Sequence, residues 1–86
     1  MANQNQHKKA LSKENSKVRV LAIYKMLLEG RRITSSEIMR RLDAQYDIQS
    51  DRKTIFNDIY AIDRIMPIDV ACGRYGGYKK FDFSEV

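Results

Sequence analysis

The chain is poor in the residues that build disulfides, metal sites and many active sites. It has one cysteine, Cys72, and one histidine, His7, among 86 residues, and it has no tryptophan. A single cysteine cannot form an internal disulfide and the sequence holds no set of zinc ligands, so we expect a cytoplasmic protein without a metal or other cofactor. It also lacks a run of about 18 apolar residues and an apolar N-terminal segment, which argues against membrane spans and secretion.

Motifs for catalysis are missing as well. The sequence has no second histidine, no Gly-Lys phosphate-binding loop, no nucleophile elbow and no pair of carboxylates at a plausible cleft. Cys72 falls at the end of an apolar alternation, where we expect a small core residue rather than a reactive thiol. We therefore do not expect an enzyme.

Acidic residues are outnumbered by basic ones. Lysine and arginine total 16 against 11 aspartates and glutamates, which gives a formal net charge of +5 at pH 7 and a pI near 9.5. This balance favours a polyanionic partner. The hydrophobic share of 43% is ordinary for a globular protein, and the length suits one domain.

Residues 1–16 carry almost nothing to bury, so we expect a flexible basic arm there, ahead of a folded domain at residues 17–86. Three lysines (Lys8, Lys9 and Lys13) against Glu14 give the arm a net charge of +2. Two roles are open for it. It is either a solvated tail or an arm that follows a phosphate backbone or enters a minor groove.

Two helices are predicted in the first half of the domain. The first should cover residues 16–29 and stop at Gly30, because apolar residues recur there at helical spacing: Val20, Leu21, Tyr24, Leu27 and Leu28. After a short extended link at Ile33, the S/T-x-x-E pattern of residues 34–37 places Thr34 at the N-cap of the second helix. That helix should end near residues 43–45.

A third helix is predicted over residues 51–66, after a turn in which Tyr46 and Ile48 are the apolar residues. Asp51 is placed to cap it, and Pro67 disfavours helical geometry at the residue before it. At 100° per residue an apolar stripe forms on one side: Ile55, Ile59, Ile62 and Met66. This stripe should face the core.

Beyond Pro67 the spacing of apolar residues changes from a helical period to the alternation of a β-strand, as in a hairpin. Ile68, Val70 and Cys72 alternate with other residues, residues 73–77 form a glycine-rich turn, and residues 78–83 can return as a second strand. Three helices followed by a hairpin predict an α+β fold, the winged helix-turn-helix, with the hairpin as its wing.

The outer side of the third helix has an unusual composition. Lys53, Asn57, Tyr60 and Arg64 lie roughly opposite the apolar stripe, with Phe56 beside them and no carboxylate among them. An ordinary solvated face mixes glutamate with lysine, whereas a helix in a DNA major groove cannot carry negative charge there. We therefore expect these four residues to contact DNA, with a plain exposed face as the alternative.

Other residues are candidates for contacts to the DNA backbone. Arg52 and Thr54 lie at the start of the third helix, where an anion is favoured. The second helix and the wing supply the rest: Arg40, Arg41, Arg74, Lys79 and Lys80. A solvated face could also explain the two second-helix arginines, and protection of a sheet edge could explain the two wing lysines.

Two further side chains have alternatives or structural roles. Phe56 could touch a thymine methyl group or a sugar, or it could pack against the turn at Tyr46. Asp58 lies beside the apolar stripe, where an unpaired carboxylate is costly. We expect it to pair with an arginine or a backbone amide.

The segment from Ile33 to Ile62 resembles the N-terminal DNA-binding domain of WYL-type bacterial regulators, which share a broader winged-helix group with DeoR-like repressors. The strongest match is the string Asp-Arg-Lys-Thr-Ile-x-x-Asp-Ile at residues 51–59, and the Gly-Gly-Tyr of residues 76–78 fits the wing of that group. The resemblance implies a transcriptional regulator, from a bacterium or a phage, that binds specific double-stranded DNA sequences.

Two departures from the family pattern matter. The family usually has arginine, a common reader of guanine or phosphate, just before the third-helix aspartate, and this chain has Asn57, which reads adenine well. Either the base preference differs or one backbone contact is weaker. Regulators of this type also often continue into a ligand-sensing or oligomerisation domain, whereas this sequence stops at Val86. It is either a stand-alone small regulator or a fragment.

A homodimer is plausible because one such domain covers too few base pairs for a unique genomic site, and the apolar remainder of the first helix could supply the contact. The main alternative function is a winged helix that serves as a protein-interaction module in a larger complex. An RNA-binding protein is a third possibility, although the chain shows no RNA-module signature.

Overall fold

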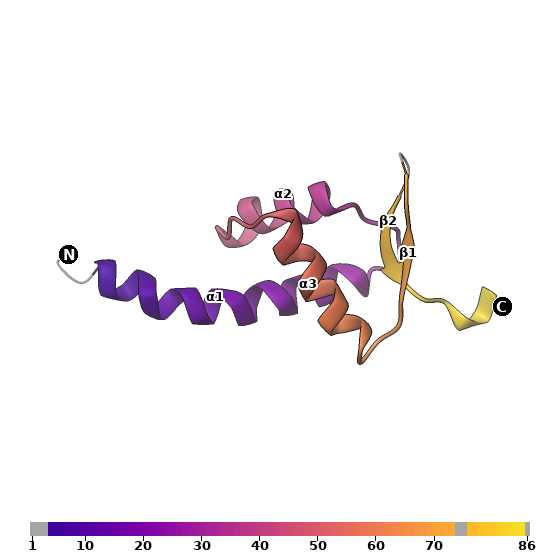
Figure 1. The fold of residues 1–86 in the computed structure, drawn as a ribbon, viewed down its shortest axis with the longest axis horizontal. Coiled ribbons are helices and arrows are strands. Elements are labelled where there is room, and N and C mark those ends of the chain that lie inside the picture. Colours follow the sequence, from indigo (N-terminus) through magenta and orange to yellow (C-terminus); the bar gives the residue numbers. More distant parts are fainter. Residues whose placement is uncertain (1–3, 74–75, 86) are drawn as a thin grey trace.

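The computed structural model describes residues 4–73 and 76–85, and it has the predicted order of three helices followed by a two-stranded antiparallel hairpin (Figure 1). This is the α+β layout of a winged helix. The elements are α1 (Gln4–Leu27), α2 (Ser35–Tyr46), α3 (Arg52–Asp63), β1 (Ile68–Ala71), β2 (Gly77–Lys80) and a 3-10 turn (Phe83–Glu85).

Helix α1 begins at Gln4 rather than near Ser16, so most of the stretch predicted as an arm is helical. In Figure 1 its first turns extend well beyond the other elements. Residues 4–16 include glutamine, lysine, alanine, leucine and glutamate and have no glycine or proline, so they can continue an existing helix at little cost. The prediction started too late because it relied on apolar periodicity, which this segment lacks.

Only some of the apolar residues whose spacing predicted α1 are buried. Leu27 is fully buried, but Leu21 and Leu28 are exposed, while Ala22, Ile23 and Met26 are buried instead. Residues 18–28 are apolar almost all round the helix, so periodicity alone could not choose which side packs inward.

Both predicted helix caps are confirmed. The hydroxyl of Thr34 accepts a hydrogen bond from the Glu37 backbone N–H at 3.1 Å, and the carboxylate of Asp51 accepts one from the Thr54 N–H at 2.8 Å. These bonds satisfy N–H groups that the first turn of a helix leaves without partners. Helix α2 ends at Tyr46, where Asp47 adopts a left-handed conformation (φ 54°).

The core lies where the three helices meet. The stripe residues predicted for α3 are buried at Ile55, Ile59 and Ile62, but α3 ends at Asp63 rather than at residue 66, and Met66 lies beyond it and is half-buried. The turn between α2 and α3 is held by Ile48 and by a half-buried Tyr46, as expected. The buried apolar side chains of these segments are Ile33, Ile38, Leu42, Ile48, Ile55, Ile59 and Ile62. Burial of one such side chain stabilises a fold by roughly 1.5–3 kcal/mol.

The hairpin is shorter than predicted and is joined to the link before α2. β1 pairs with β2 from Ile68 opposite Lys80 to Ala71 opposite Gly77. Ile33, predicted as an extended link, exchanges two backbone hydrogen bonds of 2.8 Å with Tyr78. Sequence reasoning missed this bridge, which attaches the wing to the helices.

Two expectations for the hairpin were wrong. Cys72 lies beyond β1 and is exposed, so it is not a core residue. The second strand ends at Lys80, and residues 83–85 form a 3-10 turn instead of continuing the strand to Phe83. A strand face this short buries little, so alternation of apolar residues was weak evidence for its length.

Within residues 4–73 and 76–85, no helix is both long and apolar enough to cross a membrane. In the same part of the chain, no group of three or more His, Cys, Asp or Glu side chains is placed to hold a metal ion.

Candidate nucleic-acid interface

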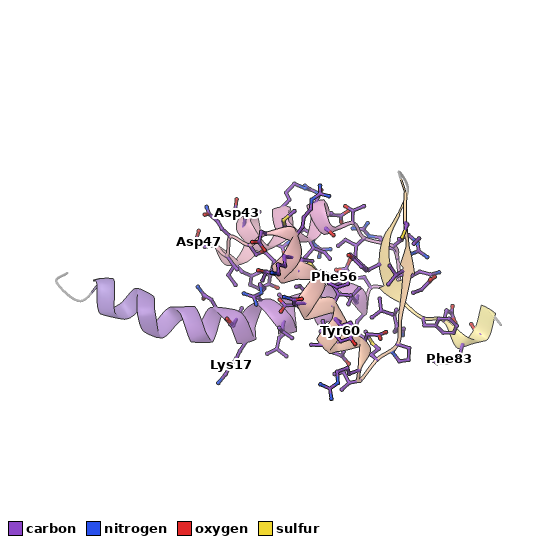
Figure 2. All side chains as sticks on the ribbon, viewed as in Figure 1. Lys17, Asp43, Asp47, Phe56, Tyr60 and Phe83 are labelled. Carbon is purple, nitrogen blue, oxygen red and sulfur yellow. The ribbon has the colours of Figure 1, made fainter. Side chains whose placement is uncertain are left out.

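The outer face of α3 is directed to solvent, opposite the side that packs on the core. Lys53, Asn57, Tyr60 and Arg64 are all exposed, and Tyr60 retains 66% of its accessible surface. Figure 2 shows all side chains on the ribbon and labels Phe56 and Tyr60 on α3. The structure thus brings the four predicted α3 residues together on one open surface.

Few interactions within the described part of the chain engage these exposed side chains. Among the described residues, neither a hydrogen bond nor a salt bridge is formed by the side chains of Asn57, Tyr60 or Arg64. Asp63, the residue before Arg64, accepts a hydrogen bond from the Ile68 backbone N–H at 2.8 Å. Asp63 therefore helps to hold the start of the hairpin.

The start of α3 combines a cap with a basic side chain. The Thr54 backbone N–H lowers the pKa of Asp51, and Lys53 contributes to this shift through its charge. Thr54, predicted to reach a phosphate, is thus already engaged in the cap. Arg52 is exposed and donates a hydrogen bond to the Ser36 hydroxyl at 3.3 Å.

Arg52 borders an open polar cavity of about 280 Å³ between the start of α2 and the wing. Its lining residues are Thr34, Ser35, Ser36, Arg52, Ala71, Gly73, Gly76, Gly77 and Tyr78. The two serines were not among the predicted site residues. The capping-box pattern that located the start of α2 could have suggested them, since it also places their hydroxyls at a helix N-terminus.

The two arginines of α2 differ in their surroundings. Arg40 is exposed. Arg41 donates to both carboxylate oxygens of Glu29, at 3.2 and 2.8 Å, and its hydrogen bond lowers the pKa of Glu29. Arg41 therefore ties α2 to the end of α1, and a contact with phosphate would require it to leave this pair.

A second ion pair extends the same network. Arg31 donates to Glu37 at 2.6 Å and lowers the pKa of that carboxyl. Glu37 thus turns towards Arg31, and only the Thr34 half of the predicted capping box is formed. The network neutralises much of the basic charge near the start of α2.

Of the predicted wing contacts, Arg74 lies outside the described residues. Lys80 is exposed, and the half-buried Lys79 stands opposite Asp69 in the sheet register. Arg32 is engaged at the wing base, where it donates to the Asp69 carboxylate at 2.7 Å and to the Gly77 carbonyl at 3.0 Å. It holds the wing in place and was not singled out from the sequence.

An apolar groove runs between α3 and the wing. Phe56 is 55% exposed and borders this groove instead of the Tyr46 turn. The groove has a volume of about 160 Å³ and is lined by Phe56, Ile59, Tyr60, Asp63, Ile68, Val70 and Tyr78. Its position depends on how the hairpin folds back over α3, which no local pattern in the sequence could reveal.

Asp58 fixes the orientation of α3 from the side of the helix that faces α1. It is buried, and its carboxylate pairs with Arg19 of α1. This confirms the expected structural role and keeps the one acidic residue in the middle of α3 away from the outer face.

Comparisons of the chain with protein-family models, with curated proteins and with solved structures find no match.

Proposed function

We propose that the protein binds double-stranded DNA with sequence preference and regulates transcription, with α3 entering the major groove. The observation that carries this proposal is the outer face of α3, where Lys53, Asn57, Tyr60 and Arg64 are exposed and no carboxylate lies among them. Two cations, an amide and a phenol match a surface made of phosphates and base edges.

The roles within α3 follow from side-chain chemistry. Asn57, in the middle of the helix, can donate to and accept from the edge of adenine in a bidentate contact. Lys53 and Arg64, near the two ends, are suited to phosphates on either side of the groove. Arg52 adds a cation close to the start of α2, where backbone N–H groups also favour an anion.

The wing is proposed to contact the neighbouring backbone or minor groove. In the described part of the wing, Lys80 is an exposed cation that could make this contact. Arg74 is a further candidate because of its place in the sequence of the turn. Arg32 holds the wing base against the helices. A wing fixed in this way would lose less entropy on binding than a free loop.

Selection of bound fragments from a random duplex library, sequenced after several rounds, tests the proposal. We expect the selected fragments to converge on one motif. A fluorescently labelled synthetic duplex that carries this motif should then bind the protein in a fluorescence-anisotropy titration. Gln45→Ala, at an exposed α2 position outside the proposed contacts, should bind that duplex like the parent chain and serves as the control. An unenriched library, with only weak salt-sensitive binding, would contradict sequence-specific recognition.

A second candidate function is supported by the apolar groove beside α3. An interface between proteins favours exposed aromatic and aliphatic groups, and Phe56, Tyr60 and Val70 offer them. In this alternative the winged helix is an interaction module. Failed library selection together with a partner captured by the parent chain, but lost with Phe56→Ala, would favour it.

A further inference from the structure

The apolar groove between α3 and the wing has one wall from each element. Phe56 and Tyr60 of α3 and Val70 of β1 line it, and all three remain more than half exposed, at 55%, 66% and 56%. Sequence reasoning left several contacts open for Phe56 and did not single out Val70. Only the packing of the hairpin beside α3 brings these two side chains into one site.

The wing turns one particular face to this groove. Val70 of β1 stands opposite Tyr78 of β2 in the antiparallel register. The next pair on the same face is Ile68 and Lys80, because alternate residues along a strand point to the same side of a sheet. Asp69 belongs to the other face by the same rule. Within β1 and β2, the groove side is therefore apolar apart from the cation Lys80.

The groove has an apolar end and an acidic end. Asp63 and Ile68 mark the acidic end, where the Ile68 backbone N–H donates to the Asp63 carboxylate. Figure 1 shows the chain turning back after α3, so that β1 runs beside the helix in the opposite sense. Val70 is two strand residues from this end, roughly 6.6 Å, and Phe56 is seven helix residues from it, roughly 10.5 Å. The apolar end thus lies between Phe56 and Val70.

The groove faces the place where the proposed function sets a DNA backbone. With α3 in the major groove and the wing at the neighbouring minor groove, one sugar–phosphate backbone must pass between the two elements, because a backbone separates adjacent grooves of a duplex. The groove is also continuous with the outer face of α3, since Tyr60 belongs to both. The occupant that fits this position is a part of that backbone.

Size and charge indicate which part of the backbone it is. The groove volume of about 160 Å³ is below the roughly 300–1,000 Å³ of pockets for drug-sized ligands. At roughly 30 Å³ per water molecule it equals about five waters, the scale of one sugar ring. The Asp63 carboxylate disfavours a phosphate inside the groove. Phosphates beside it can instead meet Arg64 and Lys80, which are exposed next to lining residues.

We propose that this groove binds one deoxyribose of the DNA backbone and selects it over ribose. The inference rests on the proposed function. The carbon–hydrogen edge of the sugar packs between Phe56 and Val70, with C2′, which lies on the major-groove side of a B-form duplex, towards α3. A ribose would place its 2′-hydroxyl against aromatic and aliphatic carbon, where the hydroxyl loses water without gaining a hydrogen bond.

A ribose scan of the selected duplex tests the proposal with the full chain. Each deoxynucleotide of the motif is replaced singly by its ribonucleotide, with the base kept the same, and affinity is measured by fluorescence anisotropy. We expect a loss of about tenfold at one sugar for each bound domain, which corresponds to about 1.4 kcal/mol. Other positions should lose no more than about twofold.

Protein variants then assign the sensitive sugar to the groove. Phe56→Ala and Val70→Ala should each reduce the ribose penalty there to about threefold or less, because they open the apolar end. Leu21→Ala, at a site on α1 that is 66% exposed and outside the groove, is the matched control and should keep the full penalty. Any change that ribose makes to duplex shape is common to all variants and cancels in this comparison. All three changed side chains are exposed, so melting temperatures should stay close to that of the parent chain.

Three results would overturn the proposal. The first is a scan with no position-specific loss, and the second is a loss that both groove variants leave unchanged. The third is a penalty that follows replacement of thymine by uracil instead of deoxyribose by ribose and disappears in Phe56→Ala, since the groove would then read a base methyl group. Each of these can occur with a convergent motif and would leave the proposed function standing, whereas an unenriched library would end both.

Discussion

Arg19 on α1 donates two hydrogen bonds to Asp58 on α3, from Nε to Oδ2 at 2.5 Å and from Nη2 to Oδ1 at 3.2 Å. Both side chains are largely withdrawn from solvent, with 18% and 9% of their surface exposed. A bidentate pair of this kind has directional geometry as well as charge attraction. It sets the rotation of α3 against α1 and hence which side of α3 faces outward.

Asp58→Ala should destabilise the protein on the order of 3 kcal/mol, because it leaves the Arg19 guanidinium largely buried and unpaired. Urea unfolding followed by circular dichroism measures this loss as a lower midpoint at unchanged slope. The double variant Arg19→Met/Asp58→Leu removes both charges and should recover most of the stability. A double variant no better than the single one would show that the pair itself, and not the unpaired charge, stabilises the fold.

Stability should fall in acid through the cap of α3. The Thr54 backbone N–H lowers the pKa of Asp51 in the folded state. The resulting stabilisation is therefore complete above the pKa of the unfolded chain and is lost as the pH falls through the lower, folded-state pKa. Melting curves recorded between neutral pH and about pH 2 span the ordinary carboxyl range.

Asp51→Asn keeps a capping oxygen but cannot titrate, so the decline in melting temperature of this variant should be shallower than that of the parent chain. Glu29, Glu37 and Asp82 also have lowered pKa values and should contribute to the remaining slope. An equally steep decline in the variant would mean that Asp51 contributes nothing to the acid sensitivity.

Gly77→Ala should displace the wing. Gly77 has a φ of +141°, and a Cβ atom there would lie 2.5 Å from the Ile33 carbonyl oxygen, next to the bridge between Ile33 and Tyr78. We expect a loss of about 1–3 kcal/mol together with faster amide exchange at Tyr78. Gly30→Ala is the matched control, since its φ is also positive (+86°) but a Cβ there would meet nothing within 4 Å.

Asn57→Ala should cost about 1–3 kcal/mol in binding to a selected DNA site and relax base preference at one position of the motif. The side chain is exposed, so the fold should tolerate the change. Repeating the library selection with the variant measures both effects at once. Unchanged affinity and an unchanged motif would remove Asn57 from the proposed contacts.

Several features of the protein could be predicted because they depend only on residues close together in the sequence. The caps at Thr34 and Asp51 and the burial of Ile55, Ile59 and Ile62 on α3 depend on residues a few positions apart, and these predictions are confirmed. The exposed, carboxylate-free set on α3 was predictable for the same reason, because opposite faces of one helix are related by a constant rotation. The order of helices and hairpin, and so the winged-helix layout, could also be read in this way.

The remaining features needed the tertiary structure because they depend on residues distant in the sequence. Helix α1 is apolar almost all round, and only its packing on α2 and α3 decided that Ile23 faces inward and Leu21 outward. The Arg41–Glu29 pair, which occupies a predicted phosphate contact, links two helices whose approach no local pattern specifies. The sequence alone therefore determined the order of the elements and which face of α3 is buried, whereas the packing of the elements decided which faces and charges remained available to a partner.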